Sequence, residues 1–156
     1  MLAARPDQKV LGYLGRALSL ELSAVQQYTT QAQLVATWGL REAAASLRKE
    51  AEEELQHADR IIERMLAIGA APNGSQLRPV KLAADLSALL RLNQQLEADI
   101  IQLYHSAVLH CARVSDYDSR VFFEALLKEE QQHHTELEAW LNRLRQVPQQ
   151  LVRGGG

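Results

Sequence analysis

The chain has 156 residues and a formal net charge of −2, and 47% of its residues are hydrophobic while 5% are aromatic. That length suffices for one domain over residues 1–156 with a core that needs no disulfides. The single cysteine, Cys111, excludes an internal disulfide and any cysteine-based zinc or iron–sulfur site within one chain. Charges of both signs are mixed without a basic block, so we expect no nucleic-acid partner. The sequence has no signal peptide and no long apolar run, so we expect a cytoplasmic protein that does not enter a membrane.

The apolar periodicity predicts an all-α fold, because the chain is rich in strong helix formers and poor in glycine and proline. Four long helices are expected, at about residues 7–37, 40–68, 82–114 and 115–146. Trp38-Gly39 marks the first turn, and Gly69 ends the second helix. Ser115 lies three residues before Asp118, a capping-box pattern that predicts the start of the fourth helix.

The connections between the helices predict the topology. The first and third connections are short, so each joins two antiparallel helices. Residues 70–81 contain several helix breakers and, when extended, reach about 40 Å at ~3.3 Å per residue. That reach matches a helix of about 28 residues at ~1.5 Å per residue, so the connection can run the length of a bundle. Helices two and three are then parallel, which is the ferritin-like arrangement of a four-helix bundle with one long crossover.

Two Glu-x-x-His motifs lie on helical faces that are otherwise apolar. Glu54 and His57 share one face of the second expected helix, and that face continues with Leu47 on one side and Ile61 on the other. Glu130 and His133 repeat the motif in the fourth. The first and third helices each carry one inward glutamate, Glu21 and Glu97, with a leucine seven residues before it and a tyrosine seven residues after it.

The two halves of the chain repeat this polar pattern with a constant shift. Residues 21, 28, 54 and 57 are matched 76 positions later by residues 97, 104, 130 and 133. A single Glu-x-x-His is most often a surface or paired core feature, but four carboxylates in one core repel one another and resist desolvation. Two divalent cations would balance four carboxylates, and oxygen and imidazole ligands suit iron or manganese. This ligand set predicts a di-metal carboxylate site.

At these residues the sequence resembles a bacterioferritin. The resemblance extends over about residues 9–144 and includes the stretches LELSAVQQY, WGL, HADRIIERML and DYDSR. It implies oxidation of Fe(II) by dioxygen or peroxide and storage of the ferric mineral in a homo-oligomeric shell of 24 subunits built from dimers. It also implies two iron ions per subunit: Glu21 and His57 on one, Glu97 and His133 on the other, and Glu54 and Glu130 bridging both. Tyr28 would lie beside this site and either orient a carboxylate or give up an electron, or simply pack with a hydrogen bond, whereas we treat Tyr104 as core.

The sequence departs from the family pattern at three places. Members of the resembled family bind haem through a methionine directly after the first bridging glutamate. This chain has Leu55 at that position. We therefore expect no haem to bind there unless a partner subunit supplies a ligand. Lys49 replaces an inner-surface histidine, although Glu53 keeps an acidic neighbour. The short tail at residues 147–156 predicts a short or absent fifth helix. We expect the remaining histidines, His105, His110 and His134, at solvent-exposed or interface positions.

Two other functions stay open at this point. One is a di-iron enzyme that reduces peroxide without storing iron and is similar to rubrerythrin, but a single cysteine cannot build the rubredoxin-type module of that family. The other is a companion subunit that mainly shapes a mixed shell, which an incomplete metal site would favour. All six expected ligands are present, so iron oxidation with storage is the preferred hypothesis.

Overall fold

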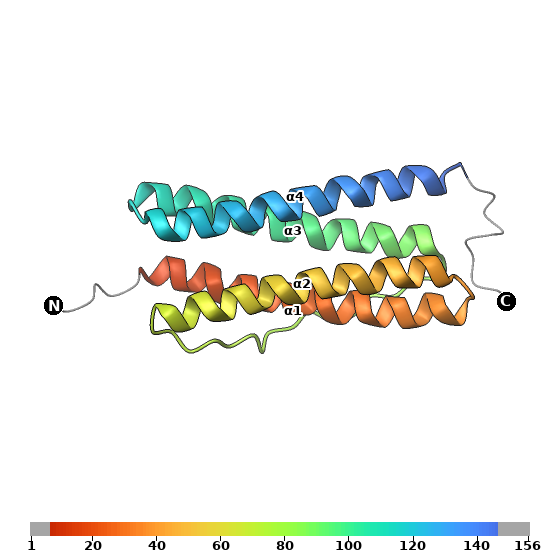
Figure 1. The fold of residues 1–156 in the computed structure, drawn as a ribbon, viewed down its shortest axis with the longest axis horizontal. Helices are drawn as coiled ribbons and strands as arrows, with labels where there is room; N and C mark the ends of the chain where they lie inside the picture. The colour runs from red at the N-terminus through yellow and green to blue at the C-terminus, as the bar shows by residue number, and fades with distance from the viewer. Residues whose placement is uncertain (1–6, 147–156) are drawn as a thin grey trace.

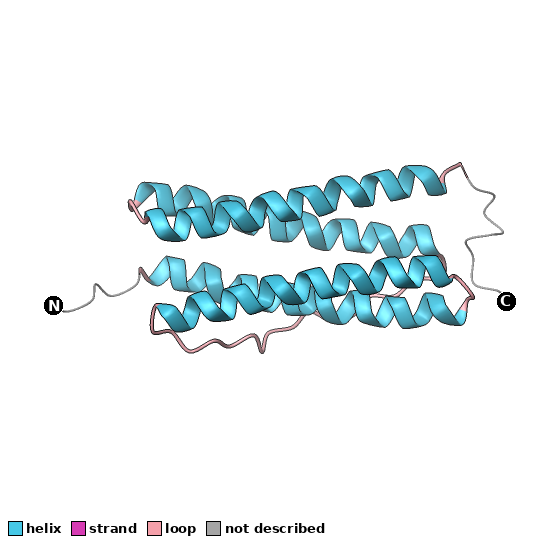
Figure 2. Cartoon of the chain, in the orientation of Figure 1, coloured by secondary structure: helices cyan, strands magenta, loops and turns pink. Residues whose placement is uncertain are grey.

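The computed structural model describes residues 7–146, and this part of the chain contains helices and loops but no strand (Figure 2). The four helices are α1 (Gln8–Thr37), α2 (Arg41–Ala67), α3 (Leu86–Arg113) and α4 (Tyr117–Leu144). α1 and α2 form one antiparallel hairpin, and α3 and α4 form the other (Figure 1). The predicted four-helix bundle is therefore confirmed. The expected short or absent fifth helix falls in residues 147–156, outside the described part.

Aspartate side chains cap three of the four helices at their N-termini. Asp7 accepts hydrogen bonds from two backbone N–H groups of α1, and Asp85 accepts one from Ala88 at the start of α3. The α4 cap is Asp116, which accepts from the N–H of Ser119 at 3.1 Å. The prediction that Ser115 caps α4 was wrong, because Ser115 has a φ of 57° and belongs to the turn that closes α3. The side-chain oxygens of these aspartates accept hydrogen bonds from N–H groups that a helix leaves unpaired. Each cap typically stabilises the fold by ~1 kcal/mol.

The connection between α2 and α3, residues 68–85, runs along α1, so α2 and α3 point in the same direction (Figure 1). Its backbone is tied down at Arg78, whose N–H donates to Ser23 Oγ at 2.9 Å and whose guanidinium pairs with Asp99. It also lies close against α1 at Gly74, where a Cβ atom would come within 2.6 Å of Leu22 Cδ1. The crossover predicted from its length is therefore a packed part of the bundle.

The apolar core consists of two clusters, one toward each end of the bundle. The first contains Leu14, Tyr28, Ile61, Ile100, Tyr104 and Phe123 among others, and the second contains Val35, Leu47, Leu89, Leu90, Leu137 and Leu141 among others. On α4, Glu130 and His133 lie between Leu126 of the first cluster and Leu137 of the second. The polar residues of the site therefore interrupt the core near the middle of the helices. Among the described residues, no helix has the length and apolar character needed to cross a membrane.

Candidate metal centre

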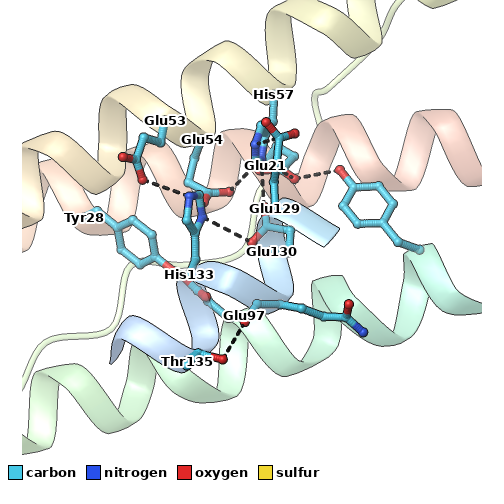
Figure 3. Close-up of polar contacts among 12 residues, drawn as sticks. Glu21, Tyr28, Glu53, Glu54, His57, Glu97, Glu129, Glu130, His133 and Thr135 are labelled. Atoms are coloured by element: carbon cyan, nitrogen blue, oxygen red, sulfur yellow. Dashed lines mark hydrogen bonds and ion pairs between the residues drawn. The ribbon is translucent and has the colours of Figure 1, made fainter. Parts of the chain in front are cut away.

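All four helices contribute inward side chains to one polar centre, which we call the carboxylate–histidine centre (Figure 3). It consists of Glu21 from α1, Glu54 and His57 from α2, Glu97 from α3, and Glu130 and His133 from α4. The structure thus brings together all six residues selected from the sequence. Their ligand atoms form two overlapping groups within the described chain, and within each group these atoms lie within 4.8 Å of one another. The groups are Glu21, Glu54, His57 and Glu130, and Glu54, Glu97, Glu130 and His133.

Each histidine of the centre contacts the glutamate of the opposite motif. His57 Nδ1 lies 2.8 Å from Glu130 Oε1, and His133 Nδ1 lies 2.9 Å from Glu54 Oε1, so both pairs join α2 to α4. His57 Nδ1 is also 3.5 Å from Glu21 Oε1. The Nδ1 atoms therefore face the interior of the centre and are the nitrogens available to a metal ion.

The outer nitrogen of each histidine faces another carboxylate (Figure 3). His133 Nε2 lies 2.8 Å from Glu53 Oε2, whereas His57 Nε2 lies 3.6 Å from Glu129 Oε2. Glu129 is also paired with Arg60. Carboxylates in this position commonly fix the tautomer and orientation of a metal-binding imidazole. Sequence reasoning missed this role, although residues 53 and 129 are again 76 positions apart.

Two buried tyrosines donate hydrogen bonds to Glu21 and Glu97, which we call the terminal glutamates of the centre. Tyr28 donates its hydroxyl hydrogen to Glu97 Oε1 at 3.0 Å, as expected for a residue beside the centre. Tyr104 donates in the same way to Glu21 Oε1 at 2.6 Å. The ring of Tyr104 is buried in the core, as expected, but the sequence did not predict that its hydroxyl contacts the site.

Four carboxylate oxygens in the centre are buried without a hydrogen-bond partner: the Oε2 atoms of Glu21, Glu54, Glu97 and Glu130. Buried oxygens of this kind cost free energy unless a partner satisfies them. Divalent cations would satisfy them and would also balance the negative charge of the four carboxylates. The donor set of oxygen and imidazole, with no thiolate, suits iron or manganese. The residues present therefore fit a pair of such ions.

Proton binding balances part of this charge. Burial raises the pKa of Glu21 well above its usual value of 4.5, and the charges of Glu54 and Glu130 raise it further. Burial raises the pKa of Glu97 in the same direction. For Glu54 burial also raises the pKa, but hydrogen bonds from neighbouring groups outweigh burial and hold its pKa well below 4.5. Glu21 and Glu97 thus tend to hold protons, while Glu54 stays charged.

The imidazoles also hold protons. Burial lowers the pKa of His57, but hydrogen bonds to Glu130, Glu21 and Glu54 reverse this and raise the pKa to about 12. The balance is the same for His133, whose pKa rises to about 11. Both rings are therefore positively charged at neutral pH when they face the carboxylates alone.

Comparisons with known proteins agree with this geometry. The family model of the ferritin-like domain matches residues 11–147. The bacterioferritin of Rhodobacter capsulatus is 36% identical over 136 residues, covering 87% of this chain and 84% of its own. The chain belongs to the bacterioferritin family. The bacterioferritin of Brucella melitensis is 32% identical over 141 residues, covering 90% of this chain and 88% of its own.

A solved structure of the Rhodobacter capsulatus bacterioferritin has a TM-score of 0.90 to this chain at 34% sequence identity, covering 94% of this chain and 91% of that one. That crystal structure has a metal-free dinuclear site and a haem iron in a crystallographic special position. The likeness extends over nearly the whole length of both chains, so the fold of the bacterioferritin family accounts for the entire described bundle.

Leu55 and Lys49, where the sequence predicts differences from the bacterioferritin pattern, lie outside the centre. Leu55 is 52% exposed on α2, and Lys49 is exposed beside a surface pocket of about 610 Å³ that Glu50, Glu53 and Glu136 also line. Burial raises the pKa of Glu50 to about 8, although the neighbouring His133 lowers it. Glu53, which contacts His133 Nε2, thus links this side of the centre to a surface pocket that acidic and basic residues both line.

The three remaining histidines differ in their surroundings. His105 is exposed and His134 is half-buried, as expected for residues outside the site. The expectation was wrong for His110, which is buried and whose Nε2 lies 2.9 Å from Asp7 Oδ1. Asp7 thus both caps α1 and pairs with α3. The sequence offered no signal for this pair, because 103 residues separate Asp7 from His110.

Proposed function

We propose that this chain is an iron-storage protein that oxidises Fe(II) at the carboxylate–histidine centre. The observation that carries the proposal is the pair of overlapping ligand groups that share Glu54 and Glu130. Iron is the substrate: two Fe(II) ions lose one electron each to become Fe(III). Dioxygen takes up both electrons and two protons to give hydrogen peroxide, or hydrogen peroxide takes them up to give two water molecules.

The six residues would divide the work between two ions. Glu21 and His57 would bind one ion, Glu97 and His133 the other, and Glu54 and Glu130 would bridge them. The shared carboxylates keep the two ions close, so that both electrons can leave for one oxidant. Tyr28 would hold Glu97 through its hydroxyl group at 3.0 Å, and the same hydroxyl places a phenol near the reacting metal pair.

The test is rapid oxidation of Fe(II) on exposure to air, followed by absorbance. We expect a fast phase with a capacity of about two Fe(II) per subunit, and its loss in Glu130→Ala and His133→Ala. Matched controls on the same helix are Glu138→Ala, at an exposed position, and His134→Ala, directly after His133. Unchanged fast phases in both Glu130→Ala and His133→Ala would refute the proposed site.

Storage requires assembly, and we propose a 24-subunit cytoplasmic shell built from dimers, as implied by membership of the bacterioferritin family. The mass of the purified protein tests this directly. A shell containing ferric mineral supports storage, and a second polypeptide in it would identify a mixed shell with a companion subunit. A stable dimer that oxidises Fe(II) with peroxide but accumulates no mineral would favour the peroxide-reducing alternative.

A further inference from the structure

Tyr104 and Tyr28 occupy equivalent places in the two halves of the bundle. Tyr104 on α3 donates to Glu21 on α1, and Tyr28 on α1 donates to Glu97 on α3. Both tyrosines have an exposed fraction of 0%. The two hydrogen bonds therefore cross between the hairpins in opposite directions.

Each tyrosine fixes one oxygen of a terminal glutamate and leaves the other free. The phenol of Tyr104 occupies Glu21 Oε1, while Glu21 Oε2 is buried without a hydrogen-bond partner. Glu97 is arranged in the same way: its Oε1 accepts a hydrogen bond from Tyr28, and its Oε2 has no hydrogen-bond partner. A neutral donor on one oxygen orients the carboxylate and directs its remaining lone pairs toward the centre.

We propose that Tyr104 is a positioning residue for the metal ion that Glu21 and His57 bind, as Tyr28 is for the ion that Glu97 and His133 bind. This inference rests on the proposed function. It makes each ion dependent on one tyrosine from the opposite hairpin. Tyr104 acts through Glu21 and has no contact of its own with the ion.

The surroundings of Tyr104 explain why a hydroxyl at this position needs the glutamate. Its ring packs beside Phe123, with ring centroids 6.1 Å apart, in the first apolar cluster. Among the described residues, Glu21 is the one hydrogen-bond partner of this hydroxyl. Burying a hydroxyl in an apolar cluster costs free energy unless it has an acceptor. The hydrogen bond from Tyr104 to Glu21 is therefore strongly favoured, and it holds the carboxylate in one orientation. Removing the hydroxyl leaves the packing intact and releases the carboxylate.

Binding of Co²⁺ to the metal-free protein tests the inference without iron oxidation, because the visible absorption of Co²⁺ reports its ligands. We expect the unmodified protein to bind about two Co²⁺ per subunit. Tyr104→Phe should weaken one of the two sites about tenfold, within the range known for groups that orient metal ligands. Tyr28→Phe should weaken the other site by a similar factor. Tyr13→Phe is the control, since Tyr13 packs against Phe123 but does not contact the centre.

Histidine variants assign each effect to a site. In His57→Ala the site that contains Glu21 is disabled, so adding Tyr104→Phe should leave the remaining Co²⁺ affinity and spectrum unchanged, while adding Tyr28→Phe should weaken it. In His133→Ala the two tyrosines should exchange these effects. This reciprocal pattern is specific to positioning, because a general loosening of the bundle would lower both sites together.

Three results would overturn the inference. Co²⁺ binding by Tyr104→Phe that matches the unmodified protein would show that the hydroxyl does not position Glu21. An equal loss at both sites, with a fall in the melting temperature, would show that Tyr104 acts only on the fold. Failure of the unmodified protein to bind two Co²⁺ would overturn the metal centre itself and this inference with it. If the unmodified protein binds two Co²⁺ and Tyr104→Phe binds them equally well, only this inference fails and the proposed function stands.

Discussion

His57 Nδ1 on α2 lies 2.8 Å from Glu130 Oε1 on α4, so the imidazole of one Glu-x-x-His motif binds the carboxylate of the other. His133 and Glu54 repeat the pair at 2.9 Å. Hydrogen bonds to the carboxylates raise the pKa of His57 to about 12 and that of His133 to about 11, so both imidazoles hold a proton at neutral pH. Protons thus balance carboxylate charge in the absence of cations, and metal binding must displace them.

The first prediction is that metal stabilises the protein more at high pH than at low pH. Co²⁺ should raise the melting temperature, since it binds the native centre and not the unfolded chain. It competes with protons on the two histidines and on Glu21 and Glu97, so its affinity rises as pH rises. Melting curves with and without Co²⁺ at about pH 5.5 and about pH 8 measure the effect. A Co²⁺-induced rise that is equal at both pH values would contradict proton displacement.

The metal-free protein should show the opposite trend. Each group whose pKa is raised in the folded state contributes stability that is complete below its unfolded pKa and is lost as pH rises toward its folded pKa. For His57 and His133 the loss begins above about pH 6.5, and for Glu21 and Glu97 above about pH 4.5. The pKa of Glu54 is lowered, so its contribution to the stability of the fold is lost only when pH falls below about 4.5. The free energy of unfolding of the metal-free protein should therefore fall between about pH 5 and pH 8.

The second prediction distinguishes the two outer carboxylates. Glu53→Ala should weaken Co²⁺ binding at the site that contains His133 by about tenfold, because Glu53 orients this ring through a 2.8 Å contact. Glu129→Ala should have a smaller effect at the other site, because its 3.6 Å separation from His57 is too long for a hydrogen bond and Arg60 already engages it. Calorimetric titration measures both.

Glu52→Ala provides the matched control for Glu53→Ala, since Glu52 is exposed on α2 directly before Glu53. It should bind Co²⁺ like the unmodified protein. If Glu129→Ala weakens binding more than Glu53→Ala does, then the distances to the histidines do not determine the contribution of these carboxylates.

The topology was predictable because the length of one connection decides it. Residues 70–81 are long enough to span the bundle. Gly39 and Gly69, which the sequence placed at a turn and a helix end, adopt a left-handed conformation with φ of 81° and 78°. The exact caps were less predictable. Ser115 and Asp116 are both good capping residues, and the choice between them depends on how the chain leaves α3.

The six residues of the carboxylate–histidine centre were predictable from their repeat, because a 76-residue shift makes a chance pattern improbable. Tyr104 obeys the same shift but was treated as core, since a tyrosine is compatible with an apolar cluster on its own. Glu53 was overlooked as a histidine partner because it precedes the inward Glu54 by one position, about 100° around the helix. The ring of His133 extends outward far enough to meet it, which only the packing of α2 against α4 reveals.

The third prediction concerns a buried amide network that joins the crossover to the bundle. Asn93 donates to Gln31 at 2.7 Å and accepts from Gln27 at 2.9 Å, and both glutamines bind the backbone of Lys81. Asn93→Leu should lower the free energy of unfolding by about 1–3 kcal/mol, because it leaves buried glutamine groups without partners. Denaturant unfolding measures the loss, and hydrogen exchange at the Lys81 amide should become faster.

Gln95→Ala tests whether this effect is specific to the buried network. Gln95 is exposed on the same helix and donates only to Asp99. Its replacement should change the free energy of unfolding by no more than about 0.5 kcal/mol. Equal losses in Asn93→Leu and Gln95→Ala would show that the network adds nothing beyond ordinary surface hydrogen bonds.

The last prediction concerns Leu55, the residue directly after the inward Glu54. One helical position turns a side chain by about 100°, and Leu55 is accordingly 52% exposed, away from the carboxylate–histidine centre. The related Rhodobacter capsulatus bacterioferritin carries a haem iron in a crystallographic special position. We expect no haem to bind through Leu55 in the homomeric protein, because a leucine side chain has no lone pair to offer to iron, and we expect Leu55 to pack in an apolar contact between subunits.

Absorption spectra of protein produced with ample haem, compared between the unmodified chain and Leu55→Met, test this expectation. The variant should gain a haem band, since a thioether sulfur can ligate iron. Leu55→Ile is the matched control, because it keeps a branched hydrocarbon without a ligand atom and should stay without the band. Fe(II) oxidation should persist in all three proteins, since the six residues of the centre lie on another face of the helices. A strong haem band in the unmodified homomer, unchanged by either substitution, would place the haem site elsewhere on the chain.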